Sequence, residues 1–146
     1  MDMPVRKRPP NPAGLEPYRR PQPWGMVPDM VINEAMEQDE HLWAPVAADI
    51  WSRPLHLNVS NGYYVHLLRV KRAGILQRHR HSGSVHAWVI RGSWYYLEHD
   101  WIATEGSYVF EPPGETHTLV VPEDCQDMIT LFTVHGSLMY LSLIHI

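Results

Sequence analysis

Two histidine-bearing stretches decide the fold: Gly74-Ile-Leu-Gln-Arg-His79-Arg-His81 and, further along, Gly106-Ser-Tyr-Val-Phe-Glu-Pro112-Pro-Gly114-Glu-Thr-His117. In a β-strand, residues i and i+2 point to the same face, so His79 and His81 present two imidazoles side by side. His117 can join them from a neighbouring strand. Three imidazoles on one face suit a divalent transition metal that keeps open coordination positions. The sequence therefore predicts a metal site formed by His79, His81 and His117.

From Tyr63 onward, the sequence has the pattern of a β-protein. Short runs rich in β-branched and aromatic residues alternate with breaks that carry glycine or proline. Short strands spaced this regularly are typical of a sandwich or a barrel. We therefore expect an all-β, jelly-roll-like barrel domain over residues 41–140. Its expected strands span residues 63–70, 75–81, 85–91, 94–99, 108–110, 116–121 and 128–134.

The N-terminal segment has a different composition. Eight of the thirteen prolines lie in residues 1–28, interleaved with five basic side chains. Proline fixes φ and lacks an N–H donor, so this stretch cannot build a helix or a central strand. We expect residues 1–40 to form a largely irregular, proline-rich arm, with a short helix near residues 33–42 capped by Asn33. The arm is either a solvated tail or a segment that binds an acidic partner or a second subunit.

Length and composition narrow the class of protein. A chain of 146 residues is about one domain. Its net charge of −4 gives no electrostatic reason to expect a nucleic-acid partner. Cys125 is the single cysteine and cannot form an intrachain disulfide, and the chain opens with proline and arginine rather than with a hydrophobic signal core. We expect a cytoplasmic protein without a membrane or nucleic-acid partner.

The last six residues, Leu141-Ser-Leu-Ile-His-Ile146, match one reading frame of the DNA end of a common transposon-based sequencing adapter. We therefore expect residues 141–146 to be an adapter-derived tail and the natural domain to continue past Tyr140. His145 is excluded as a ligand on this ground.

The histidine stretches resemble the two sequence motifs of the cupin superfamily. Gly74 precedes His-x-His and Gly92 closes motif 1, while the second stretch follows motif 2 closely. The resemblance implies a cupin barrel, but the position of the usual metal-binding Glu, counted back from Gly92, holds Val85. Val121 replaces the usual Asn at the end of motif 2. Three neutral imidazoles would leave a divalent metal with its full +2 charge, so we expect the site to favour an anionic chelating substrate such as an enolate.

His86 offers an alternative in motif 1, because a count longer by one residue places it at the Glu position. It is either a fourth ligand or a histidine that lies behind the ligands or on the surface. Strand alternation places Val85 and His86 on opposite faces, and Gly92 favours the shorter count. Five other histidines have no ligand spacing, and we interpret them as ordinary: His41, His56, His66, His99 and His135.

The residues around the motifs resemble the 2,4′-dihydroxyacetophenone dioxygenase family of cupins. The resemblance is carried by His79-Arg-His-Ser-Gly-Ser-Val-His-Ala-Trp88, Gly92-Ser-Trp-Tyr-Tyr-Leu-Glu98 and Glu111-Pro-Pro-Gly-Glu-Thr-His-Thr-Leu119. It implies a non-haem Fe(II) centre held by three histidines. It also implies that an α-hydroxyketone is split with O₂, giving 4-hydroxybenzoate and formate. Three histidines alone also suit Zn, Mn, Ni and Cu.

Other side chains near the motifs have two interpretations each. Glu98 assists proton removal if it points inward, or is solvated at a strand end. Glu111 lies behind the metal ligands or in the pocket, or belongs to a surface turn. Trp88 and Tyr96 line an aromatic pocket, or pack in the core or against another subunit.

Three function classes follow. The leading one is an Fe(II) dioxygenase that cleaves the C–C bond of an aryl α-hydroxyketone, with a small aromatic ketone and O₂ as its partners. The second is a three-histidine isomerase or lyase that does not need O₂, and oxygen dependence separates these two. The third is a sensory or regulatory metal-binding cupin, like the metal-binding domains of some anti-sigma factors, which a pull-down would test. We also expect a homo-oligomer, formed through sheet edges or the arm.

Overall fold

The computed structural model describes residues 7–141, and residues 1–6 and 142–146 lie outside the described part. The chain divides into two units, Met1–Glu37 and Gln38–Ile146. Among residues 7–141, no helix is both long and apolar enough to cross a membrane. Of the expected adapter-derived tail, only Leu141 falls within the described residues.

The described part of the first unit, residues 7–37, contains turns but neither a helix nor a strand. Every side chain in residues 7–31 is exposed. The prolines explain the absence of regular structure, because they remove backbone donors along the segment.

Within residues 33–42, the helical part is one short 3₁₀ turn, η1 (Glu40–Leu42), which belongs to the second unit. Its cap is Asp39, whose side chain accepts a hydrogen bond from the backbone N of His41 at 3.0 Å. Asn33 does not start a helix, because Glu34 has a φ of 56° and so lies in the left-handed region.

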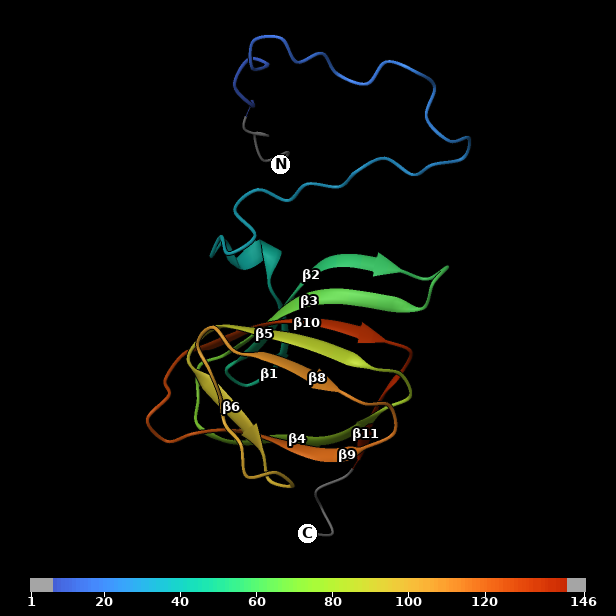
Figure 1. Ribbon diagram of the computed structural model, residues 1–146. Helices are drawn as coiled ribbons and strands as arrows, with labels where there is room; N and C mark the ends of the chain where they lie inside the picture. The colour runs from blue at the N-terminus through green and yellow to red at the C-terminus, as the bar shows by residue number, and fades with distance from the viewer. Residues whose placement is uncertain (1–6, 142–146) are drawn as a thin grey trace. The chain divides into compact units, whose positions relative to one another are not determined.

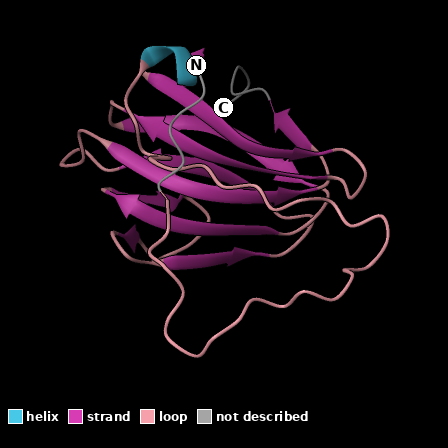
Figure 2. Ribbon diagram, turned by 90° about the horizontal axis from the view of Figure 1, so that it is seen from above, coloured by secondary structure: helices cyan, strands magenta, loops and turns pink. Residues whose placement is uncertain are grey.

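The second unit is built from two antiparallel sheets, seen as two layers in Figure 1, and strands make up most of it (Figure 2). This arrangement confirms the expected all-β, jelly-roll-like barrel. The first sheet has the order β1 (Ala44–Ala47), β2 (Ile50–Asn58), β3 (Tyr63–Val70), β10 (Met128–His135), β5 (Val85–Arg91), β8 (Tyr108–Glu111). The second has the order β11 (Leu138–Leu141), β4 (Gly74–His81), β9 (Thr116–Val121), β6 (Ser93–Tyr96), β7 (Ala103–Thr104).

The core fills the space between the two sheets. Along β5, Val85, Ala87 and Val89 are buried while the side chains between them are more exposed, as strand alternation requires. Trp94 and Tyr96 on β6 reach the same core from the other sheet. This apolar interior surrounds the histidine motifs and limits the access of water to them.

Four strands lie outside the expected set: β1, β2, β7 and β11. β2 lacks a clean alternation of buried and exposed positions, and Pro54 is followed by an irregular register before His56. The expected strand 94–99 ends earlier, as β6, at Tyr96. Pairing with β3 keeps β2 in the sheet, and this long-range interaction is absent from any local sequence pattern.

Candidate metal centre and its cavity

The three histidines of the expected metal site lie together on the second sheet. β4 carries His79 and His81, and β9 carries His117 directly opposite His79 in the pairing register. Their exposed fractions are 4%, 6% and 1%. The Nε2 atoms of His79 and His117 are 3.1 Å apart. The His-x-His alternation and the register of one strand pair are therefore enough to assemble the three imidazoles.

Glu111 joins this group from the opposite sheet. It ends β8, and the register pairs it with Val85 on β5, so the two side chains share the inward face. Its Oε2 atom lies 3.5 Å from Nε2 of His117 and 3.8 Å from Nε2 of His81. One ligand atom from each of the four residues lies within 4.8 Å of the others. A carboxylate thus stands beside the position where motif 1 lacks its glutamate.

The four side chains fit a divalent metal ion. Oε2 of Glu111 is buried and has no hydrogen-bond partner among the described residues, which is costly unless a cation or donor satisfies it. For metal–ligand bonds of about 2.1 Å, neighbouring ligand atoms are about 3.0 to 3.4 Å apart. The spacing of 3.1 Å between His79 and His117 matches that range. We call His79, His81, Glu111 and His117 the metal group.

Burial keeps the imidazoles of the metal group neutral. It lowers the pKa of His79 to about 3, helped by the neighbouring His117 and His81. Burial likewise lowers the pKa of His117 to about 4 and the pKa of His81 below its usual value. A neutral imidazole is the form that binds metal, so the site needs no proton release from its histidines near neutral pH.

Tyr96 connects the carboxylate and one histidine of the metal group. Its hydroxyl donates a hydrogen bond of 2.7 Å to Oε1 of Glu111, and its ring stacks on His117 with centroids 3.8 Å apart and planes 3° apart. Burial raises the pKa of Glu111 to about 7, although the hydrogen bond from Tyr96 opposes this shift. Burial and the Glu111 charge raise the pKa of Tyr96 well above its usual value, so its hydroxyl stays a donor.

The structure places Glu111 beside the three expected imidazoles, in a group of four that could hold a metal ion. If Glu111 bound a divalent ion as a carboxylate, the net charge of the site would fall from +2 to about +1. The sequence placed Glu111 behind the ligands, in the pocket or in a surface turn, and did not name it as a ligand, because it comes from β8, next to Val85 rather than in its place. The sequence carried only a weak signal that Glu111 points inward. Glu111 is two residues from the apolar Val109, so the two side chains share one face of a short strand.

Glu98 lies outside the metal group and is exposed. Its carboxylate accepts hydrogen bonds from the backbone N of Thr118 at 2.7 Å and from Oγ1 of Thr118 at 2.8 Å. Partial burial acts to raise the pKa of Glu98, but these bonds and the nearby Arg78 charge lower it overall. Glu98 is therefore anchored to Thr118 on β9, the chain neighbour of His117.

His86 and Trp88 lie on the outward side of β5, away from the metal group. Nδ1 of His86 is 2.6 Å from the hydroxyl of Tyr108, and Trp88 packs against the same tyrosine. Trp88 is 52% exposed. The inward neighbour of His86 is the fully buried Val85, as the shorter motif count and strand alternation require.

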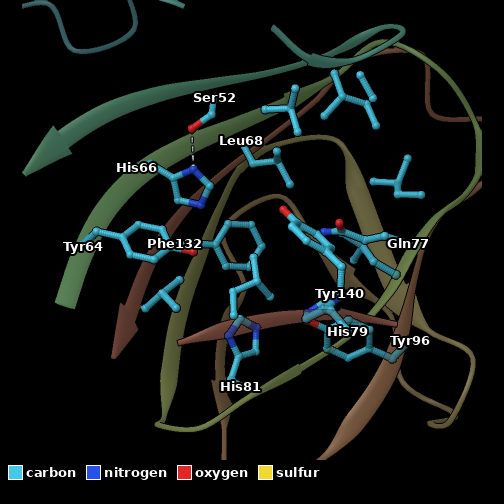
Figure 3. A pocket seen from close by; sticks show the side chains of 17 residues that line it. Ser52, Tyr64, His66, Leu68, Gln77, His79, His81, Tyr96, Phe132 and Tyr140 are labelled. Carbon is cyan, nitrogen blue, oxygen red and sulfur yellow. Dashed lines mark hydrogen bonds between the residues drawn. The ribbon is translucent and has the colours of Figure 1, made fainter. Parts of the chain in front are cut away.

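A cavity of about 240 Å³ opens beside the metal group, between the two sheets. Figure 3 shows His79, His81 and Tyr96 at one side of it and Ser52, Tyr64 and His66 at the other. Its walls are largely apolar and include Leu68, Leu76, Leu119, Phe132 and Val134. Exposed lining residues on the edge strands β1 and β11 mark its entrance.

Several lining residues were outside the sequence-based expectation. Ser52, Tyr64 and Tyr140 come from β2, β3 and β11, away from the histidine motifs. His66, interpreted from the sequence as an ordinary histidine, also lines the cavity. Of the expected pocket aromatics Trp88 and Tyr96, only Tyr96 is among the lining residues that the structure describes.

Comparison with known proteins agrees with this fold. An RmlC-like cupin protein from Ralstonia eutropha JMP134 is 33% identical, with a TM-score of 0.63 over 69% of this chain and 67% of that one. An acetylacetone dioxygenase from Acinetobacter johnsonii is 18% identical, with a TM-score of 0.63 over 81% and 84% of the chains. The structure of Rhodobacter sphaeroides SigE in complex with the anti-sigma ChrR contains a match at 17% identity and a TM-score of 0.54, over 63% and 47%. Among curated proteins, none matches significantly.

Fold and site together define a cupin with a buried histidine and glutamate group. The similarities below 25% identity show the fold alone, whereas the family model of the ChrR cupin-like domain matches residues 33–139. The chain therefore belongs to the ChrR cupin-like domain family. It spans about two thirds of the length of its Ralstonia relative.

Proposed function

We propose that this chain is a non-haem Fe(II) dioxygenase that cleaves the C–C bond next to the carbonyl of a small aryl α-hydroxyketone, giving a carboxylic acid and formate. The observation that carries the proposal is the cavity of about 240 Å³ lined by two residues of the metal group, His79 and His81. A cavity of about 150 Å³ accommodates a benzene ring, so this one has room for a substituted ring. A purely structural metal site would not need such a cavity.

His79, His81, His117 and Glu111 would hold the metal, because their ligand atoms converge and Oε2 of Glu111 is otherwise without a partner among the described residues. Bound Fe(II) would supply Lewis-acid and redox chemistry towards a chelating ketone and O₂. One carboxylate beside three neutral imidazoles leaves the site cationic, so an enolate-type substrate is still attracted.

The remaining task of the chain is to orient the substrate and exclude water. Tyr96 fixes His117 by stacking and Glu111 by its hydrogen bond, so both keep their direction before a ligand binds. Apolar walls around the cavity lower the local dielectric, which strengthens the attraction between the cationic site and an enolate.

The deciding experiment is O₂ consumption by Fe(II)-loaded protein given 2,4′-dihydroxyacetophenone, with 4-hydroxybenzoate and formate assayed in parallel. We expect each O₂ consumed to yield one 4-hydroxybenzoate and one formate. This activity should be lost in His117→Ala, which removes a metal-group imidazole. Acetylacetone serves as a second substrate because acetylacetone dioxygenases share the fold. If protein that retains iron consumes no O₂ with either ketone, the dioxygenase proposal is wrong.

A regulatory function is the second candidate, and it rests on the family assignment and on the structural match to the SigE–ChrR complex. In that case, metal occupancy would change binding to a protein partner. Absence of O₂ uptake together with a metal-dependent partner in a pull-down would favour it. A third candidate, an isomerase or lyase, would convert the ketone equally well under anaerobic conditions.

A further inference from the structure

The cavity has a second polar end, opposite the metal group. Ser52 on β2 and His66 on β3 belong to the first sheet, whereas His79 and His81 belong to the second. Figure 3 shows the two sets on opposite sides of the cavity. Because the backbones of packed sheets are about 10 Å apart, one small ligand can contact both ends.

Ser52 and His66 form a defined pair. Oγ of Ser52 and Nδ1 of His66 are 2.7 Å apart, and this hydrogen bond is drawn in Figure 3. This hydrogen bond uses Nδ1 and does not involve the other ring nitrogen, Nε2. One nitrogen of a cavity-lining imidazole is thus occupied while the other is available to a ligand.

The surroundings of His66 are polar but uncharged. Burial lowers the pKa of His66 to about 4, so the ring is neutral near pH 7. Burial, followed by the nearby Tyr140, raises the pKa of Tyr64 to about 12, so its hydroxyl is also neutral. No Lys, Arg, Asp or Glu is among the cavity-lining residues within 7–141. A charged ligand group at this end would lose its hydration without gaining a counter-ion.

We propose that the Ser52–His66 pair is a specificity site that binds an uncharged hydroxyl on the aryl ring of the substrate, at the end remote from the metal group. This proposal rests on the proposed function and assigns its substrate class: an aryl ketone with a neutral hydroxyl far from its chelating end. Nε2 of His66 hydrogen-bonds this hydroxyl, and Ser52 holds the imidazole in orientation. Phe132, whose ring centroid is 5.9 Å from that of His66, provides an apolar contact for the aryl ring.

The test compares ligands by binding rather than by turnover. Dissociation constants are measured by calorimetry under anaerobic conditions, with Zn(II)-loaded full-length protein. The probes are 2,4′-dihydroxyacetophenone, the analogue that lacks the ring hydroxyl, and the analogue with a carboxylate in its place. We expect the hydroxyl compound to bind about tenfold more tightly than the analogue without it, as for one buried hydrogen bond. The carboxylate should bind most weakly.

His66→Phe keeps an aromatic ring and removes both nitrogens. The ratio of the dissociation constants of the analogue without the hydroxyl and of the hydroxyl compound should therefore fall from about ten to about one. Ser52→Ala should reduce it partly. Thermal unfolding and metal content identify a variant that fails to fold. If His66→Phe does not fold, the ligand preference of Ser52→Ala decides the test. The proposal is overturned if the wild-type protein binds the first two ligands equally, or if the preference survives in the folded variants.

The outcome is separable from that of the proposed function. A preference that depends on His66, without O₂ consumption, would uphold the recognition site and reject the dioxygenase reaction. Equal binding of the first two ligands, together with O₂ consumption and product formation, would reject the recognition site and uphold the reaction.

Discussion

Glu111 is the member of the metal group whose protonation state changes near neutral pH. Because burial raises its pKa to about 7 while the pKa values of His79 and His117 are lowered to about 3 and 4, Glu111 is the proton source expected on metal binding. We predict release of about one proton per metal at about pH 6 and little at about pH 8.5. Calorimetry in buffers of different ionisation enthalpy measures this number.

Glu111→Gln is the matched control, because it keeps an oxygen that can accept from Tyr96 and removes the titratable group. It should abolish the pH-dependent proton release and weaken metal binding by about tenfold or more. Unchanged affinity and proton release in this variant would show that Glu111 does not bind the metal.

His66 gives a pH dependence of stability that is separate from the metal group. Its pKa is about 4 in the folded chain and about 6.5 when unfolded. As the pH falls below about 6.5, His66 becomes protonated in the unfolded chain but stays neutral in the folded chain. The free energy of unfolding therefore decreases. We predict that His66 accounts for a loss of about 2 kcal/mol between about pH 7 and about pH 5. Urea unfolding of wild type and His66→Phe measures it as a difference in pH dependence, and parallel curves would contradict it.

At the residue scale, sequence spacing predicts some of the site and not the rest. His79 and His81 are two residues apart, so local strand geometry alone puts them on one face. Glu111 and His66 reach the metal group and the cavity only through pairing between distant strands, Val85 with Glu111 and Pro54 with His66. A sequence pattern cannot supply this register.

At the scale of elements, Gly92 determines how β5 turns into β6. It has a φ of 74°, and an added Cβ would lie 2.7 Å from the backbone oxygen of Asp127 and 2.7 Å from Sγ of Cys125. Gly106 has a similar φ of 87°, but a Cβ added there would meet nothing within 4 Å among the described residues. We predict that Gly92→Ala lowers the free energy of unfolding by about 2 kcal/mol or more, and Gly106→Ala by about 1 kcal/mol.

Chemical denaturation of the two glycine variants checks this difference. Both substitutions share the cost of a left-handed backbone, so the comparison isolates the steric contact near Asp127 and Cys125. Equal losses of stability would mean that the chain relaxes around Gly92 at no cost.

The strands around the histidine motifs were predictable from the sequence, whereas β1, β2, β7 and β11 were not. β3, β5, β9 and β10 are rich in β-branched and aromatic residues and match the expected ranges within a residue or two. β1 is exposed throughout, and β11 nearly so, hence neither shows the alternation of a half-buried strand. These two edges frame the cavity entrance, so the part of the site that determines access was the part that the sequence did not predict.

At the scale of the whole molecule, the two units differ in their contribution to stability. Residues 7–31 are exposed, whereas the buried core lies entirely within the second unit. We predict that deleting residues 1–31 changes the Tm by less than about 3 °C and leaves metal binding unchanged. Differential scanning calorimetry with and without metal measures both, and a large drop in Tm would assign the arm a structural role.

The homo-oligomer expected from the sequence remains a prediction. The outward face of β5 and β8 exposes Trp88, Tyr108 and Phe110, each about half accessible, which is a candidate self-association surface. We predict a mass above the monomer's 16.9 kDa by light scattering, and a shift towards the monomer in Phe110→Glu. A monomeric wild-type protein would contradict it.

The position of Glu111 has a mechanical consequence. His79, His81 and His117 lie on one sheet and Glu111 lies on the other. An ion bound by all four would therefore cross-link the two sheets. Loading the ion would then restrain the separation of β8 from β9 and slow exchange of their amide hydrogens with solvent. Metal occupancy would thereby change the rigidity of the whole barrel, including strands that do not touch the ion.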